Sequence, residues 1–210
     1  DHTTARYPHA QGPEEGTTLE VAPGVHWVRM RMPFPPEHIN LWLLADGDGW
    51  TIVDCGLGLE TTRAAWDRIF AERLGGRPVT RVIVTHFHPD HVGNAAWLAA
   101  RWGVEVWMTQ AEWLSARALY APSGDDDIAV KLDFYRRNGV GAAELEAMRT
   151  PHNVFVRRMV PELPARFVRL RHGQDVAIDG RRWRITVGRG HAPEHACLWC
   201  EELGVLIAGD

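Results

Sequence analysis

The chain has 210 residues, of which 45% are hydrophobic and 24% are charged, and its formal net charge at pH 7 is −4. This composition is typical of a soluble globular protein with one substantial core. The negative charge argues against nucleic acid as the main partner, and no apolar run reaches the roughly 20 residues that a membrane-spanning helix needs.

The N-terminal part is predicted to be a polar segment followed by strands. Residues 1–18 are polar and contain no signal-peptide core. Two pairs of strands follow, before and after the proline-rich loop 33–38: Leu19–Ala22 with Val25–Met32, and Ile39–Ala45 with Trp50–Asp54. Asp46-Gly47-Asp48-Gly49 is a strong hairpin signal. Gly56 and Gly58 allow a sharp exit from the last strand, which places Asp54 at its carboxyl end.

The next segment alternates between helix and strand. Leu59–Leu74 has an apolar face and is followed by two glycines, so it is predicted to be a helix. A strand at Val79–Thr85, a helix at Ala95–Trp102 with Asn94 as its cap, and a strand at Val104–Met108 follow. This order predicts a βαβ layer.

Residues 110–164 change in character and are predicted to be mainly helical. The predicted helices are Trp113–Tyr120, Ile128–Asn138 and Ala142–Arg149. The acidic run Asp125–Asp127 is expected to be a solvated helix start. Because this block lies between two groups of potential ligands, it could form a lid over a site, or it could simply pack against the rest of the domain.

Strands return after Pro164. They are predicted at Phe167–Leu170, Asp175–Ile178, Arg182–Val187, Ala196–Cys200 and Val205–Ala208. A second sheet built mainly from these strands would complete a sandwich. The three cysteines cannot form a full disulfide framework, which favours a cytoplasmic location. Cys197 and Cys200 would point to opposite faces of their strand, so core packing is expected for both rather than a shared metal.

A dense group of potential metal ligands follows the strand at Val79–Thr85. His86 and His88 are two residues apart in extended chain and can therefore point in the same direction. Asp90 and His91 come where the backbone has to turn. Imidazole and carboxylate groups in this pattern favour a metal site, with room for two ions.

Three segments resemble motifs of the metallo-β-lactamase superfamily. Thr85–Gly93 matches its pattern Thr-His-x-His-x-Asp-His-x-Gly at every position. Gly190–His195 resembles the Gly-His-Thr-Pro-Gly-His segment, with Ala192 in place of Thr and Glu194 in place of Gly. Val205–Asp210 resembles the strand whose final aspartate bridges two metals. The family's fifth motif, which ends in another histidine, is absent.

The resemblance implies an α/β fold, a four-layer αβ/βα metallo-β-lactamase sandwich. The predicted organisation is a polar segment over 1–18 and a domain over 19–210 that lacks its C-terminal part, with a helical insertion at about 110–164. It also implies two Zn2+ ions, with iron or manganese as alternatives. By this resemblance His86, His88 and His191 bind the first ion, Asp90 and His91 bind the second, Asp210 bridges the two, and Asp54 orients a histidine.

The implied activity is that of a metallo-hydrolase of the glyoxalase II-like or lactonase-like branch. The branch follows from Asp210, since true metallo-β-lactamases usually lack the bridging aspartate. A zinc-bound hydroxide, oriented by Asp90, would cleave an ester-type bond in a thioester, a lactone or a related acyl substrate. His195 would bind a carboxylate or the substrate, or would have a structural role only. An apolar pocket for such a substrate could be built by Phe34, Trp42, Phe87, Tyr120 and Tyr135.

Three other functions remain open on the same fold: a phosphodiesterase or nuclease, a mononuclear-iron sulfur dioxygenase, and an inactive metal-binding scaffold. The expected partners are a small-molecule substrate and the remainder of the polypeptide beyond residue 210. No membrane partner is expected, and the sequence does not predict an oligomeric state.

Overall fold

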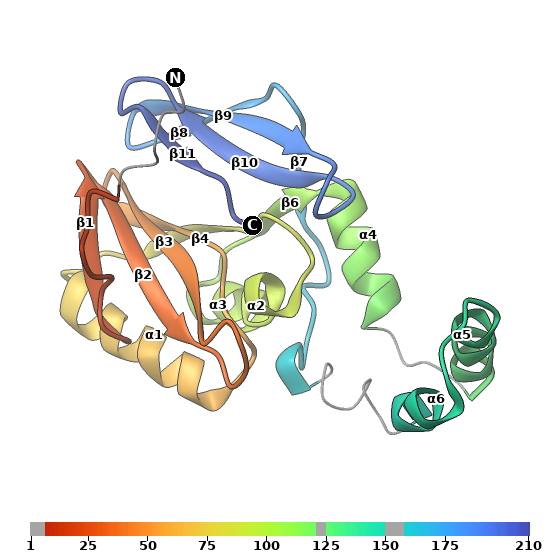
Figure 1. Cartoon of the computed structure of the whole chain (residues 1–210). Helices are drawn as coiled ribbons and strands as arrows, with labels where there is room; N and C mark the ends of the chain where they lie inside the picture. The colour runs from red at the N-terminus through yellow and green to blue at the C-terminus, as the bar shows by residue number, and fades with distance from the viewer. Residues whose placement is uncertain (1–6, 121–124, 150–157) are drawn as a thin grey trace, which may run out of the picture.

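The computed structural model describes residues 7–120, 125–149 and 158–210, and it contains two β-sheets that face each other (Figure 1). The larger sheet has seven strands in chain order: β1 (Thr18–Ala22), β2 (Val25–Arg31), β3 (His38–Asp46), β4 (Gly49–Val53), β5 (Val79–Ile83), β6 (Val106–Thr109) and β7 (Val168–Leu170). The smaller sheet has the order β11 (Val205–Ile207), β10 (His195–Cys200), β9 (Arg181–Gly188) and β8 (Asp175–Ile178).

The larger sheet changes direction at its centre. Neighbouring strands from β1 to β4 are antiparallel, and those from β4 to β7 are parallel. Parallel strands need a crossover, and helices α1 (Glu60–Arg73) and α3 (Ala95–Trp102) provide two of them, with the single-turn helix α2 (Pro89–Val92) before α3. All five residues of β4 are buried, as expected for a strand covered on both faces. The predicted βαβ layer is therefore present.

The second sheet is built mainly from the predicted C-terminal strands, as expected, but the first of these strands belongs to the larger sheet. The strand predicted at Phe167–Leu170 is β7, which pairs in parallel with β6 through Trp107 and Val168. The unpaired backbone groups along the edge of β6 accept this strand, so β7 extends the larger sheet. The second sheet consists of the remaining four predicted strands.

Two apolar clusters fill the spaces between the layers. Leu43, Ile52 and Val82 belong to the cluster between the larger sheet and its helices. Their chain neighbours Leu44, Val53 and Ile83 belong to the cluster between the two sheets. Successive side chains on a strand point to opposite faces, so one run of apolar residues supplies both clusters. Each fully buried side chain of this size contributes about 1.5–3 kcal/mol.

The outer face of the smaller sheet differs from the inner one. Trp199 and Leu206 are opposite each other on β10 and β11, and they are 37% and 52% exposed. Cys200 is buried as predicted, but Cys197 is only half-buried, because it lies on the same outer face of β10 as the exposed Trp199. Its thiol donates to the carbonyl of Ala208.

The helical region contains α4 (Gln110–Leu119), α5 (Asp125–Arg137) and α6 (Ala142–Arg149), close to the predicted bounds. Helix α4 packs beside β6, whereas α5 and α6 pack against each other and stand apart from the two sheets (Figure 1). Val130 and Phe134 on α5 are exposed, so this pair of helices leaves apolar surface uncovered. A lid function stays a prediction. The side chains of Asp125–Asp127 lie outside the described residues. Among the described residues, no helix is long and apolar enough to cross a membrane.

Candidate metal centre

The ligand candidates gather at one edge of the parallel part of the larger sheet. Asp54 follows β4 and His86 follows β5, and the carboxyl ends of neighbouring parallel strands lie side by side. Helix α2 begins with Pro89, whose fixed φ suits the first helical position. This single turn of helix brings His91 close to the segment that follows β4. The carbonyl of His91 accepts a hydrogen bond from the backbone N–H of Cys55 at 2.9 Å, which links the loop that carries the histidines to the end of β4.

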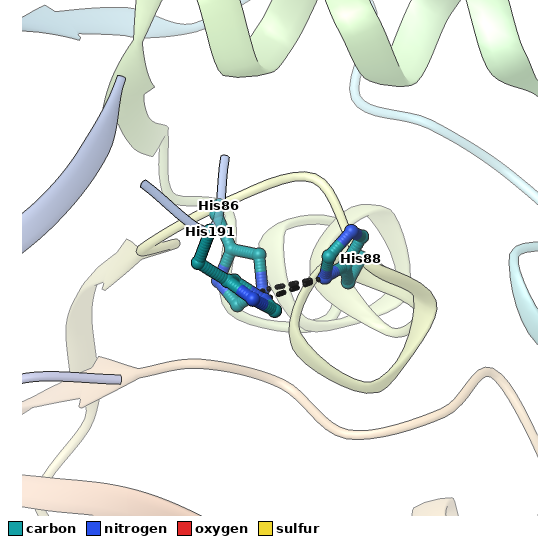
Figure 2. Close-up of side chains that lie close together, drawn as sticks. All are labelled: His86, His88 and His191. Atoms are coloured by element: carbon teal, nitrogen blue, oxygen red, sulfur yellow. Dashed lines mark hydrogen bonds between the residues drawn. The ribbon is translucent and has the colours of Figure 1, made fainter. Parts of the chain in front are cut away.

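Three histidine side chains converge at this edge (Figure 2). Nε2 of His191 lies 3.1 Å from Nε2 of His86 and 2.9 Å from Nδ1 of His88. The third distance, from Nε2 of His86 to Nδ1 of His88, is 3.0 Å. The loop that follows β5 and a second loop more than 100 positions later thus present nitrogen atoms to a common point.

These three nitrogens fit a bound cation. Tetrahedral Zn2+ with Zn–N bonds of about 2.0–2.1 Å would place its ligand nitrogens about 3.3 Å apart, close to the spacing found here. Three imidazole nitrogens at this spacing cannot all satisfy one another by hydrogen bonds, because a neutral ring has only one donor. Burial, followed by the neighbouring histidines, lowers the pKa of His86 strongly, so its ring is neutral and available as a ligand.

A second group of donors adjoins the first. His86, His91 and Asp210 offer ligand atoms that lie within 4.8 Å of one another. Asp210 lies between the groups: its Oδ1 is 3.3 Å from Nε2 of His91 and its Oδ2 is 3.6 Å from Nε2 of His191. The Nε2 atom of His91 is buried and, among the residues that the structure describes, has no hydrogen-bond partner of good geometry, which is a further sign that this atom faces a ligand position.

Asp54 and Thr85 hold His91 from behind. Oδ2 of Asp54 is 2.8 Å from Nδ1 of His91. The same carboxylate accepts from the backbone N–H of Thr85 at 2.8 Å and from its hydroxyl. Burial lowers the pKa of His91, but the carboxylates of Asp54, Asp210 and Asp90 raise it to about 10 overall. Asp54 therefore occupies the place that the sequence predicted, behind a histidine and outside the ligand groups.

Asp90 and His195 occupy less central positions. The Oδ2 atom of Asp90 is 3.6 Å from Nε2 of His91, and Asp90 is not in either group of three donors found among the described residues. His195 is 3% exposed, and its Nε2 accepts from the backbone N–H of Asp210 at 3.3 Å. A Cβ on Gly209 would lie 2.6 Å from this ring, so the glycine allows the close approach. The role of His195, catalytic or structural, stays a prediction.

Two predictions at the centre are wrong. Asn94 makes no side-chain cap on α3; its amide donates to the carbonyl of Leu57, and its oxygen accepts from Nε of Arg63. Buried in the turn, the side chain satisfies backbone groups of the loop after β4 instead. The five aromatic residues do not form one pocket: Trp42 packs between the sheets, and Tyr135 lies beside Phe134 on α5.

Sequence reasoning missed residues that support the centre from α4 and from the segment after the helices. Glu112 is fully buried and binds the backbone of the His86–His91 loop. Met159 is buried, and its carbonyl accepts from the N–H of Gly58 at 2.7 Å. The sequence signal for Glu112 is weak, because this residue precedes the predicted helix Trp113–Tyr120 and glutamates at such positions are usually exposed.

Comparisons with known proteins agree with this geometry. A family model described as the metallo-beta-lactamase superfamily matches residues 34–210. The chain is 24% identical over 202 residues to "Probable metallo-hydrolase YflN" of Bacillus subtilis (strain 168), a match that covers 93% of this chain and 66% of that protein.

Solved structures give the same result. A beta-lactamase domain protein from Burkholderia ambifaria is 44% identical, with a TM-score of 0.82 over 96% of this chain and 56% of that chain. The metallo-beta-lactamase family protein TTHA1429 from Thermus thermophilus is 27% identical, with a TM-score of 0.73 over 90% of this chain and 60% of that chain. The chain thus spans less than two thirds of the length of each of these relatives. The comparisons confirm the predicted sandwich fold.

Proposed function

Because the chain belongs to the metallo-β-lactamase superfamily, we propose that it is a metal-dependent hydrolase that cleaves an ester-type bond. The observation that carries the proposal is the convergence of three histidine nitrogens within 3.1 Å of one another, beside a second group that includes Asp210. These donors are imidazole and carboxylate groups, which suit Zn2+ and also iron or manganese.

The residues of the chain divide into two ligand sets in this proposal. His86, His88 and His191 would hold one cation, and His91 with Asp210 would hold a second, with Asp210 shared. Divalent cations held in this way would supply a hydroxide nucleophile near neutral pH and would stabilise negative charge that develops on the substrate. Asp54 would keep the ring of His91 in one orientation and one tautomer.

In this proposal Asp90 handles the proton. Its carboxylate is partly exposed and lies 3.6 Å from Nε2 of His91, where it could contact a water molecule. We assign it the role of orienting that water and accepting its proton. An acyl substrate, such as a thioester or a lactone, is favoured over a nucleic acid because the net charge of the chain is −4.

The test is a substrate panel with defined metals. Protein freed of metal by chelation would be reloaded with Zn2+, Mn2+ or Fe2+ and assayed on a thioester, a lactone, a phosphodiester and a β-lactam. Faster hydrolysis of the thioester or the lactone is expected, with activity that follows metal content. Cleavage of the phosphodiester alone, or oxygen consumption with iron in place of hydrolysis, would contradict the proposal. Metal binding without turnover of any substrate would indicate a scaffold.

A further inference from the structure

Glu112 connects the two loops that carry the three histidines. It lies in the first turn of α4 and is fully buried. Its Oε2 accepts from the backbone N–H of Phe87 at 3.0 Å, and its Oε1 accepts from the backbone N–H of Glu194 at 2.5 Å. Phe87 stands between His86 and His88, and Glu194 lies three residues after His191. One carboxylate therefore ties together both sources of ligands.

Groups of the loops also accept hydrogen bonds from the start of α4. Glu194 accepts from the backbone N–H of Ala111 through its side chain at 3.0 Å and from the hydroxyl of Thr109 through its carbonyl at 2.8 Å. The hydroxyl of Tyr120, at the far end of α4, donates to the carbonyl of Phe87 at 3.1 Å. Both backbone polar groups of Phe87 are thus bound by side chains from α4.

The chemistry of a buried carboxylate explains why this link is stiff. An ionised carboxylate is costly to bury unless hydrogen bonds replace its water, and here each oxygen has a backbone donor. Backbone donors, unlike side chains, cannot rotate away. Movement of either loop by a fraction of a bond length would therefore weaken a charge-assisted hydrogen bond, so Glu112 resists any change in the distance between the loops.

We propose that Glu112 is a positioning residue that sets the spacing between His88 and His191, so that both reach the same cation. The inference rests on the proposed function only in that a metal binds the His86, His88 and His191 group. It does not depend on which substrate is cleaved. Glu112 belongs to neither group of ligand donors found among the described residues, and it acts through the backbone of Phe87 and Glu194.

The substitution Glu112→Gln tests this assignment. The side chain keeps its size, but one of its two acceptor oxygens becomes an NH2 group that faces a backbone N–H. We expect the affinity of the three-histidine group for Zn2+, measured by chelator competition, to fall by about ten- to hundredfold. The visible absorption of the Co2+-substituted protein, which reports ligand geometry, should change as well. Glu105→Gln makes the same change at an exposed residue next to β6 and should alter neither property.

A merely structural role for Glu112 predicts a different result. Glu112→Gln would then lower the unfolding midpoint of the metal-free protein, while the folded variant would keep the wild-type Zn2+ affinity and Co2+ spectrum; this result would overturn the inference. If Glu112→Gln does not fold, Tyr120→Phe removes the bond to Phe87 from the other side. It should weaken Zn2+ binding at least severalfold, and unchanged binding would again contradict the inference. Wild-type protein that binds Zn2+ but hydrolyses nothing would refute the proposed function alone.

Discussion

Asp54 Oδ2 lies 2.8 Å from Nδ1 of His91, and the backbone of Asp54 has a φ of +64°. A positive φ is uncommon for residues other than glycine, although aspartate and asparagine tolerate it better than most. This conformation turns the carboxylate back toward Thr85 and His91 at the end of β4. The backbone strain is offset by the hydrogen bonds that the carboxylate accepts from both residues.

Asp54→Asn should weaken metal binding without unfolding the protein. Asparagine also tolerates the positive φ. It has only one acceptor oxygen, however, whereas the two carboxylate oxygens of Asp54 accept hydrogen bonds from Thr85 and His91. We expect the affinity for the more weakly held metal equivalent to fall by about ten- to hundredfold, because the orientation of His91 is lost. Chelator titration with elemental analysis measures this. Asp67→Asn, an exposed change on α1, serves as the control, and equal affinities in the two variants would argue against the role of Asp54.

His88→Ala should remove one of the three converging nitrogens. Two imidazoles hold a divalent ion far less well than three, so the variant should lose one metal equivalent per chain and all hydrolytic activity above background. Elemental analysis of dialysed protein gives the stoichiometry. His172→Ala removes an exposed histidine outside the centre and should keep both properties. Full metal content in His88→Ala would contradict the ligand assignment.

Asp46 should make the stability of the protein depend on pH. Burial raises the pKa of its carboxyl, but hydrogen bonds from Asp179, Thr51 and Thr80 and the charge of Arg81 lower it overall. A depressed pKa in the folded state stabilises the protein above the unfolded value near 3.8, and this stabilisation is lost as the pH falls through the folded value.

The substitution Asp46→Asn tests this linkage. At pH 7 we expect the free energy of unfolding to fall by about 1–3 kcal/mol, because a charged acceptor of several hydrogen bonds is replaced by a neutral one. The difference from wild type should shrink below about pH 4, where the carboxyl of the unfolded chain takes up a proton. Urea unfolding at a series of pH values measures it, with the exposed Asp48→Asn as the matched control. A difference that stays constant with pH would contradict the linkage.

Gly93→Ala should destabilise the fold by overpacking. A Cβ at Gly93 would lie 2.5 Å from the carbonyl oxygens of Met159 and Pro89 and 2.6 Å from the N atom of Gly58. Backbone atoms cannot move aside as flexible side chains do, so the loss should be about 1–3 kcal/mol or more. Gly188→Ala should change the unfolding midpoint little, because a Cβ there meets no atom of the described part of the chain within 4 Å. Equal midpoints for the two variants would show that the segment at Met159 can shift.

Local patterns in the sequence predicted most of the elements and the ligands that are close in the chain. Apolar runs between turn signals predicted β3, β4 and β5. The two glycines after Leu74 predicted the end of α1, and Asp46-Gly47-Asp48-Gly49 predicted a hairpin turn, because such signals depend only on residues that are close in the chain. The histidines at 86, 88 and 91 were identified for the same reason. His191 and Asp210 were assigned by resemblance to a family pattern.

Other features depended on contacts between distant segments. The nitrogens of His86 and His191 are 105 residues apart in the chain, and only the packing of the second sheet against the first brings them to 3.1 Å. β7 belongs to the larger sheet because its backbone pairs with the otherwise unpaired edge of β6. The side chain of Asn94 does not cap α3 as predicted. It donates to the carbonyl of Leu57, because it is buried beside the loop that follows β4.

The sequence by itself determined the types of donor group that the candidate metal centre offers, because the histidines and aspartates and their local spacing can be identified in the chain. The family resemblance placed Asp54 behind a histidine, but only the tertiary structure decided that this histidine is His91 and that Glu112 joins the two ligand loops. Asp54 behind His91 and Glu112 between the two loops act through hydrogen bonds that span 37 and as many as 82 residues of chain. Such bonds exist only after the sheets and α4 have packed, because their directions are set by backbone positions that no local pattern specifies.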